Sequence, residues 1–241
     1  MKKVAILIPG LVRTYKKTQH IFFTNIIDKN RDSFKIDTYL AFWDYTHQRG
    51  PLGSKTEVRP IDDSELNEIL KLYNPKDYLV LDNYEKKQEE FAYCADKIAK
   101  KIGIPKHPDG VSLIKNGILA QTYTWKMAFE LIDEEYDFVL KYRFDAASEA
   151  LNFKEMRDNE FNCAGPSHQH IQYGIADVVF GSDLRTMSKV MTGYYDLAIG
   201  NSLPNPEGGY PNIYQEYILK EFLKQNKIPI NYLNKRVHII R

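Results

Sequence analysis

The chain has 241 residues, which is enough for one large domain or two small ones. Its 33 Lys and Arg residues are balanced by 32 Asp and Glu residues, and the formal net charge of +1 argues against a nucleic-acid-binding protein, which normally carries a basic surplus. A hydrophobic fraction of 43% with 27% charged residues is typical of a folded globular protein and not of a disordered one.

The N-terminal segment and the cysteines bear on the compartment. The apolar run at residues 4–8 ends at Pro9 and Gly10, which makes it too short for a signal-peptide core or a membrane span. Cys94 and Cys163 are the only cysteines and lie far apart, so a disulfide framework or a zinc site is not expected. We therefore expect a cytoplasmic protein without a membrane span.

Strands and helices are expected to alternate in the first half of the chain. Short β-branched runs that end at turn residues predict strands, and apolar residues at helical spacing after a capping residue predict helices. The expected strands are Lys3–Ile8, Phe34–Trp43 and Tyr78–Leu81. The expected helices are Lys16–Ile27, Asp62–Asn74 and Glu85–Ile102. Gly and Pro residues predict loops at Arg49–Ser54 and Ile104–Gly110.

The second half continues this alternation. A long helix is expected to carry Ile114, Ile118, Gln121, Trp125, Phe129 and Ile132 on one stripe. Strands are expected at Asp137–Lys141, Asn162–Pro166 and Ala176–Phe180, and one or two more in Ile228–Ile240. A helix is expected from the caps Ser182 and Asp183 to about Ile199, and a later one is expected to carry Ile213, Tyr217, Ile218 and Phe222. A loop is expected between these helices at Asn201–Pro211. The pattern predicts an α/β fold with a mostly parallel central sheet flanked by helices and a small antiparallel edge.

Two common nucleotide-binding motifs are absent. The sequence has neither a G-x-G-x-x-G fingerprint after a strand nor a G-x-x-x-x-G-K-[ST] loop, which disfavours a dinucleotide-binding protein and a P-loop enzyme.

Ligands of open parallel sheets bind at the carboxyl ends of the strands. At the first such end, Gly10 allows a ligand to approach the backbone and Arg13 can bind a phosphate, although a plain turn with a surface arginine is the simpler explanation.

Two more strand ends carry candidate residues. Trp43 offers a stacking face and Asp44 an acceptor for sugar hydroxyls; a half-buried tryptophan beside a cap is an equally good explanation.

Lys141, Arg143 and Asp145 follow a buried strand and project from one side of an extended backbone. Cations beside one carboxylate suit a metal-bound diphosphate, since Mg²⁺ or Mn²⁺ takes one or two carboxylates plus phosphate oxygens. The alternative is a surface ion pair between Arg143 and Asp145.

Polar residues later in the chain are candidates for acid–base chemistry. Asp177 opens an expected strand and can bind an acceptor hydroxyl or act as a base. Glu216 near a helix start can also be a general base, although a helix-dipole role explains it equally well. His168 and His170 can ligate a metal, but a solvated loop is the more common setting for such a pair.

The order of these motifs resembles a group of small GT-A-fold glycosyltransferases found in large DNA viruses of algae and in bacterial surface-polysaccharide clusters. The resemblance covers residues 3–230. It rests on five segments in the same order, namely residues 4–13, 36–43, 121–125, 136–145 and 176–182.

The resemblance implies transfer of a sugar from a nucleotide-diphosphate sugar, commonly a UDP-sugar, to a hydroxyl of a glycan acceptor. It implies that Gly10, Leu11 and Arg13, in the segment that starts at Pro9, contact the nucleotide and that Gln121 faces the same cleft. The usual metal motif of the group is Asp-x-Asp, but Arg143 stands at its first position and only Asp145 remains. A divalent cation, Mn²⁺ or Mg²⁺, is therefore expected to be weakly bound or dispensable.

For such a transfer, Arg13, Arg143 and a metal at Asp145 are expected to stabilise the leaving diphosphate. An inverting enzyme needs a base, for which Asp177 is the first candidate and Glu216 the second, whereas a retaining enzyme needs none and can use the leaving phosphate; the sequence does not distinguish the two. One domain over residues 1–241 is expected, with a nucleotide-binding part of about 1–150 and an acceptor part of about 151–241.

The alternatives to a glycosyltransferase are a sugar-phosphate nucleotidyltransferase and a catalytically degenerate protein that binds glycans or nucleotide sugars.

Overall fold

The computed structural model describes residues 1–48, 57–82, 84–101, 115, 118–164, 175, 177–200 and 215–240. The three loops expected at Arg49–Ser54, Ile104–Gly110 and Asn201–Pro211 lie outside the described residues, and so do His168 and His170.

A mixed, mostly parallel sheet forms the centre of the described part of the chain, with seven strands in the order β10-β8-β9-β6-β1-β2-β5. Strand β1 is parallel to both of its neighbours, β2 and β6, and β2 is also parallel to β5. Strand β8 is parallel to β10, whereas β9 is antiparallel to both β6 and β8. The strands are β1 (Lys2–Gly10), β2 (Phe34–Trp43), β5 (Asp77–Leu81), β6 (Phe138–Lys141), β8 (Phe161–Ala164), β9 (Phe180–Ser182) and β10 (Ile230–Leu233).

Two small antiparallel sheets accompany it: β3 (Tyr45–Gln48) pairs with β4 (Glu57–Pro60), and β7 (Ala146–Ser148) pairs with β11 (Val237–Ile239). The α/β architecture with a mostly parallel central sheet and small antiparallel pieces is thus confirmed.

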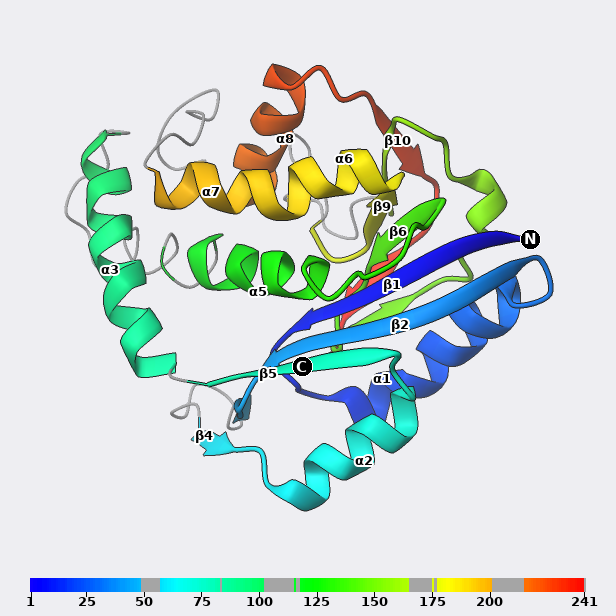
Figure 1. Ribbon diagram of the computed structural model, residues 1–241, viewed down its shortest axis with the longest axis horizontal. Coiled ribbons are helices and arrows are strands. Elements are labelled where there is room, and N and C mark those ends of the chain that lie inside the picture. Colours follow the sequence, from blue (N-terminus) through cyan, green and yellow to red (C-terminus); the bar gives the residue numbers. More distant parts are fainter. Residues whose placement is uncertain are drawn as a thin grey trace.

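Helices cover both faces of the sheet (Figure 1). One side carries α5 (Ala120–Phe129), α6 (Leu184–Ser188), α7 (Tyr194–Ile199) and α8 (Gln215–Gln225), and the other carries α1 (Tyr15–Phe22) and α2 (Asp63–Tyr73). The helix α3 (Tyr84–Lys101) lies at the end of α5 and α7, and π-helical turns at Phe23–Asp28 and Lys189–Gly193 extend α1 and join α6 to α7. Across the described ranges, every helix is too short or too polar to cross a bilayer.

Alternating side chains of β1 supply two separate cores, because successive residues of a strand point to opposite faces. Ala5 and Leu7 belong to the core beneath the α5 side, which also contains Phe222 of α8. Val4, Ile6 and Ile8 belong to the core beneath α1 and α2. Their complete burial explains why this segment has a continuous apolar run, as is typical of a strand covered on both faces.

Several expected elements have the predicted bounds. The strand expected at Phe34–Trp43 is β2, with the same ends. The helix expected after Asp62 is α2, whose first turn is capped because the Asp62 side chain accepts a hydrogen bond of 2.8 Å from the Glu65 amide. Asn74, at a φ of 41°, ends it as expected.

Two expectations were wrong in their bounds. The helix expected to extend to Ile132 ends at Phe129. The strand expected at Ala176–Phe180 begins only at Phe180, and Asp177 lies in a bend before it. The Asp177 and Val178 carbonyls, just before β9, accept hydrogen bonds from the Lys141 amine.

Candidate active site

A cavity of about 330 Å³ opens at the carboxyl ends of β1, β2 and β6. Its volume lies at the lower end of the range of small-molecule sites, and its position is the one at which open α/β sheets bind ligands. Because the three strands are parallel neighbours, their ends meet at one edge, and the first turns of α5 close the side. The lining residues are Pro9, Gly10, Leu11, Arg13, Trp43, Tyr45, Tyr84, Ala120, Gln121, Thr124, Trp125, Lys141, Arg143, Phe144 and Asp145.

Most candidate residues from the sequence meet at this cavity. Those that line it are Pro9, Gly10, Leu11, Arg13, Trp43, Gln121, Lys141, Arg143 and Asp145. Gly10 has a φ of 120°, a conformation that favours glycine, and apart from Gly10 and its two chain neighbours no heavy atom of the described residues lies within 4 Å of the place where a Cβ would stand. The backbone at Gly10 is therefore open to close approach by a ligand.

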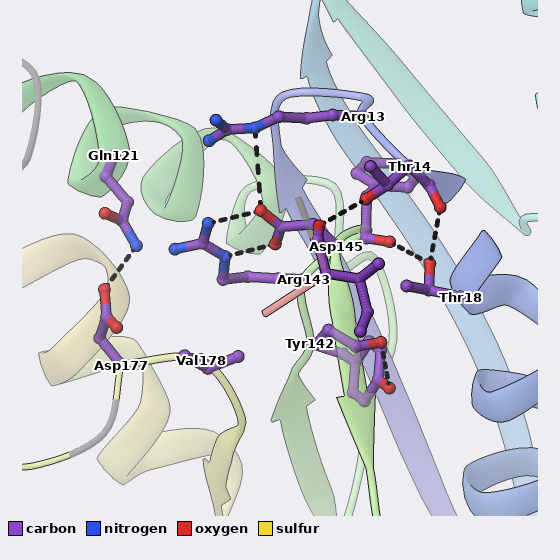
Figure 2. Close-up of polar contacts among 12 residues, drawn as sticks. Arg13, Thr14, Thr18, Gln121, Tyr142, Arg143, Asp145, Asp177 and Val178 are labelled. Atoms are coloured by element: carbon purple, nitrogen blue, oxygen red, sulfur yellow. Dashed lines mark hydrogen bonds and ion pairs between the residues drawn. The ribbon is translucent and has the colours of Figure 1, made fainter. Parts of the chain in front are cut away.

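Two arginines converge on the carboxylate of Asp145 (Figure 2). The Arg143 Nε and Nη2 atoms donate to its two oxygens at 2.8 and 2.9 Å, and the Arg13 Nε lies 3.7 Å from Oδ2. The Asp145 side chain is only 5% exposed, so this is a buried ion pair and not the surface pair that was the alternative. Burial raises the pKa of Asp145, but the guanidiniums of Arg143 and Arg13 outweigh burial and lower it below its usual value.

Lys141 is fully buried behind this pair. Its amine donates to the backbone carbonyls of Asp177 and Val178 and lies 4.9 Å from the ring centre of Trp125. Burial in these surroundings lowers the pKa of Lys141 to about 7, against the attraction of Asp177. We therefore expect the charge of Lys141 to change near neutral pH.

Two carboxylates, those of Asp177 and Glu216, act electrostatically on this lysine and are not among the lining residues of the cavity. The Asp177 Oδ2 accepts a hydrogen bond of 2.6 Å from the Nε2 of Gln121, which does line it (Figure 2). Glu216 stands in the first turn of α8, and its backbone carbonyl accepts from the Ile175 amide at 3.2 Å. Burial and the nearby charge of Asp177 raise the pKa of Glu216 to about 7.

The aromatic lining residues are Trp43, Tyr45, Tyr84, Trp125 and Phe144, and only Trp43 was a site candidate from the sequence. Trp43 lines the cavity, but it is 2% exposed and stacks on Tyr123 with ring centres 5.7 Å apart, so the stacking face expected from the sequence is partly used within the protein. Tyr45 and Tyr84, whose ring centres are 4.2 Å apart, stand beside it and were missed. Tyr45 is the second residue after Trp43 and was within reach of a local search, whereas Tyr84 carries no local signal.

Asp44 is the substrate-binding candidate that does not line the cavity. Its backbone amide donates to the Leu81 carbonyl at 3.0 Å, and its carbonyl accepts from the Ile61 amide at 2.8 Å. These bonds give Asp44 a structural role in joining the end of β2 to β5 and to the start of α2.

The residues at Asp145 do not fit a divalent cation. Both carboxylate oxygens are already bonded to Arg143, and the guanidiniums lie where a cation bound to those oxygens would be repelled. Within the described ranges, no group of three or more His, Cys, Asp or Glu residues is arranged to hold a metal ion. The metal site expected at Asp145 is therefore not supported by the contacts of this side chain.

No protein-family model and no curated protein sequence matches the chain. The fold is similar to that of mouse xyloside xylosyltransferase 1 in its apo form, with 97% of this chain and 85% of that one covered, 6% identity and a TM-score of 0.47. Apo glycosyltransferase GlyE of Streptococcus pneumoniae TIGR4 aligns over 97% of this chain but 45% of its own, at 11% identity and a TM-score of 0.47. The galactosyltransferase LgtC, solved with donor and acceptor sugar analogs, covers 92% of this chain and 70% of its own, at 11% identity and a TM-score of 0.44. These likenesses are too distant to assign an activity.

Proposed function

We propose that the chain is a glycosyltransferase that moves a sugar from a nucleoside-diphosphate sugar, with a UDP-sugar favoured, to a hydroxyl of a glycan acceptor. The observation that carries the proposal is the convergence of Arg13 and Arg143 at a cavity with an open backbone at Gly10. Guanidinium groups suit phosphate oxygens, and a glycine without a side chain lets a diphosphate approach the chain closely. The sequence resemblance points to the same reaction.

In the proposed reaction, the bond between the anomeric carbon and the diphosphate oxygen breaks, and its electron pair leaves with the diphosphate. The oxygen of the acceptor hydroxyl forms the new bond to that carbon. Negative charge grows on the leaving diphosphate in an oxocarbenium-like transition state, and Arg143 and Arg13 stabilise it at the cavity wall. The buried amine of Lys141 adds positive charge behind them.

The acceptor hydroxyl must also lose a proton. We assign Asp177 as the base that takes it directly, because Gln121, which lines the cavity, holds one oxygen of this carboxylate at 2.6 Å and so places it next to the cavity. Glu216, the second candidate, lies close enough for the charge of Asp177 to raise the pKa of Glu216. The two carboxylates belong to the proposed acceptor part of the chain, about 151–241, and the arginines to the nucleotide-binding part, about 1–150. Both parts contribute to each of the two cores, in keeping with one domain.

The proposal is tested by incubating the protein with UDP-, GDP- and dTDP-sugars and measuring release of the nucleoside diphosphate with and without acceptor saccharides. We expect one donor to raise the melting temperature and to release its diphosphate slowly to water and faster with an acceptor. Pyrophosphate release from a sugar phosphate and a nucleoside triphosphate would instead identify a nucleotidyltransferase. Binding without any turnover would identify a degenerate binding protein.

The pH dependence of the reaction follows from two groups with a pKa of about 7, Glu216 and Lys141. As the pH rises through 7, Glu216 loses its proton and the carboxylate pair becomes a better base, while Lys141 loses the positive charge that attracts the donor. The pH profile of kcat/KM, which reports ionisations of the free enzyme, is therefore expected to be a bell with its maximum near pH 7.

Profiles of variants between pH 5 and 9 check this expectation. Glu216→Gln should lose the acid limb and keep the basic one, because glutamine does not titrate. Glu221→Gln, on the same helix, is the matched control and should keep the bell. An unchanged acid limb in Glu216→Gln would contradict the role given to Glu216.

A further inference from the structure

The carboxylate that stands in the place of a metal ligand is fully occupied by cationic side chains. Arg143 binds it through two nitrogens, and Arg13 approaches the same carboxylate from the turn after β1. Figure 2 shows the two guanidiniums extending from separate segments toward Asp145. Two guanidiniums stand against one carboxylate at this point, so the local charge around Asp145 is positive and attracts an anion.

Two hydrogen bonds from other elements and one within the turn restrain the backbone that carries this pair. The Phe144 carbonyl accepts a hydrogen bond of 2.5 Å from the Thr18 hydroxyl of α1. The Asp145 carbonyl accepts from the Ile240 amide at 2.8 Å, and the Ala146 amide donates to the Arg143 carbonyl at 3.1 Å. These bonds restrain the segment without a ligand, and charged groups that are already in place stabilise a transition state better than groups that must first be ordered.

We propose that Asp145 is a positioning residue that holds Arg143 and Arg13 toward the cavity, and that the site binds the diphosphate of its donor through these guanidiniums without a divalent cation. This inference rests on the proposed function and goes further, since it replaces the metal by fixed cationic side chains. A cation on the Asp145 oxygens would have to displace Arg143 and would leave two guanidiniums beside it. A diphosphate, in contrast, is attracted by the same arrangement as it stands.

Calorimetric titration tests the inference on the unmodified protein. UDP, GDP and CDP are titrated in EDTA and again in excess Mn²⁺, and free Mn²⁺ is followed by its electron paramagnetic resonance signal. We expect the best nucleoside diphosphate to bind with dissociation constants within about threefold of each other in the two buffers, and the protein to take up no Mn²⁺ beyond that held by the nucleotide alone.

Weakening of binding by more than tenfold in EDTA would overturn the inference and leave the proposed function standing. Absence of binding in both buffers would overturn both. The two failures are thus distinguishable, and neither measurement requires a variant to fold.

Chemical rescue tests the positioning role of Asp145. In Arg143→Ala, added guanidinium ion at millimolar concentration in EDTA is expected to restore turnover at least tenfold, because Asp145 still offers two oxygens to hold it. In Arg143→Ala/Asp145→Asn the rescue should be absent. Equal rescue in both variants would show that Asp145 has only a structural role. Arg59→Ala is the control for loss of an ion pair, because it breaks the bidentate pair of Arg59 with Glu65 outside the cavity lining. Added guanidinium should neither raise nor lower the turnover of this variant.

Discussion

Replacing Arg143 by alanine is expected to lower kcat/KM by about 10²–10³, the loss typical for removing one preorganised donor to a developing negative charge. The loss should fall mainly on kcat, because the diphosphate gains most of its negative charge after the glycosidic bond begins to break. Initial rates with the best donor, measured over a range of donor concentrations, separate kcat from KM.

Stability must be measured beside activity, because Arg143→Ala leaves the buried carboxylate of Asp145 with less compensation. Breaking one half of a buried pair costs about 3–5 kcal/mol, so a lower melting temperature is expected. Arg143→Lys keeps the charge, loses the two parallel hydrogen bonds and should fold while still losing at least tenfold in kcat, as a lysine cannot reproduce a bidentate contact. Full activity in Arg143→Lys would contradict the guanidinium role.

Replacing Asp177 by asparagine is expected to lower kcat by about 10²–10⁴, the usual contribution of a general base. The change is small in every other respect. The amide keeps an oxygen for the hydrogen bond from Gln121, and Lys141 contacts the backbone carbonyl of Asp177, which the substitution leaves in place. The melting temperature should therefore stay close to that of the unmodified protein.

Asp196→Asn is the matched control for Asp177→Asn. Asp196 pairs with Lys126 at 2.8 Å on an exposed surface, and its replacement should leave the rate unchanged. A rate for Asp177→Asn within threefold of the unmodified protein would exclude Asp177 as the base.

The sequence predicted those parts of the fold that depend on local patterns. The apolar run of β1 and the cap at Asp62 determine a strand and a helix by themselves, and both lie where they were expected. The placement of β9 between β6 and β8 was not predictable, because it depends on contacts between distant segments. These contacts are the pairings of β9 with β6 and with β8 and the bond from the Lys141 amine to the Asp177 carbonyl, 36 residues further along the chain.

The same distinction holds for the candidate site. Gly10, Trp43 and Lys141 lie at the ends of neighbouring parallel strands, so their meeting at one cavity followed from the strand assignment. The pairing of Arg143 with Asp145 was considered from the sequence only as a surface contact, because spacing does not reveal burial. Tyr84 reaches the cavity from α3 through tertiary packing, for which its own neighbours in sequence give no sign.

The most direct test of this account is a crystal structure of the protein with its best nucleoside diphosphate bound. We predict that the diphosphate lies in the cavity, with its oxygens about 3 Å from the guanidinium nitrogens of Arg143 and Arg13 and next to the backbone of Gly10. A diphosphate bound elsewhere on the protein, with Arg143 and Arg13 contacting only Asp145, would contradict the account.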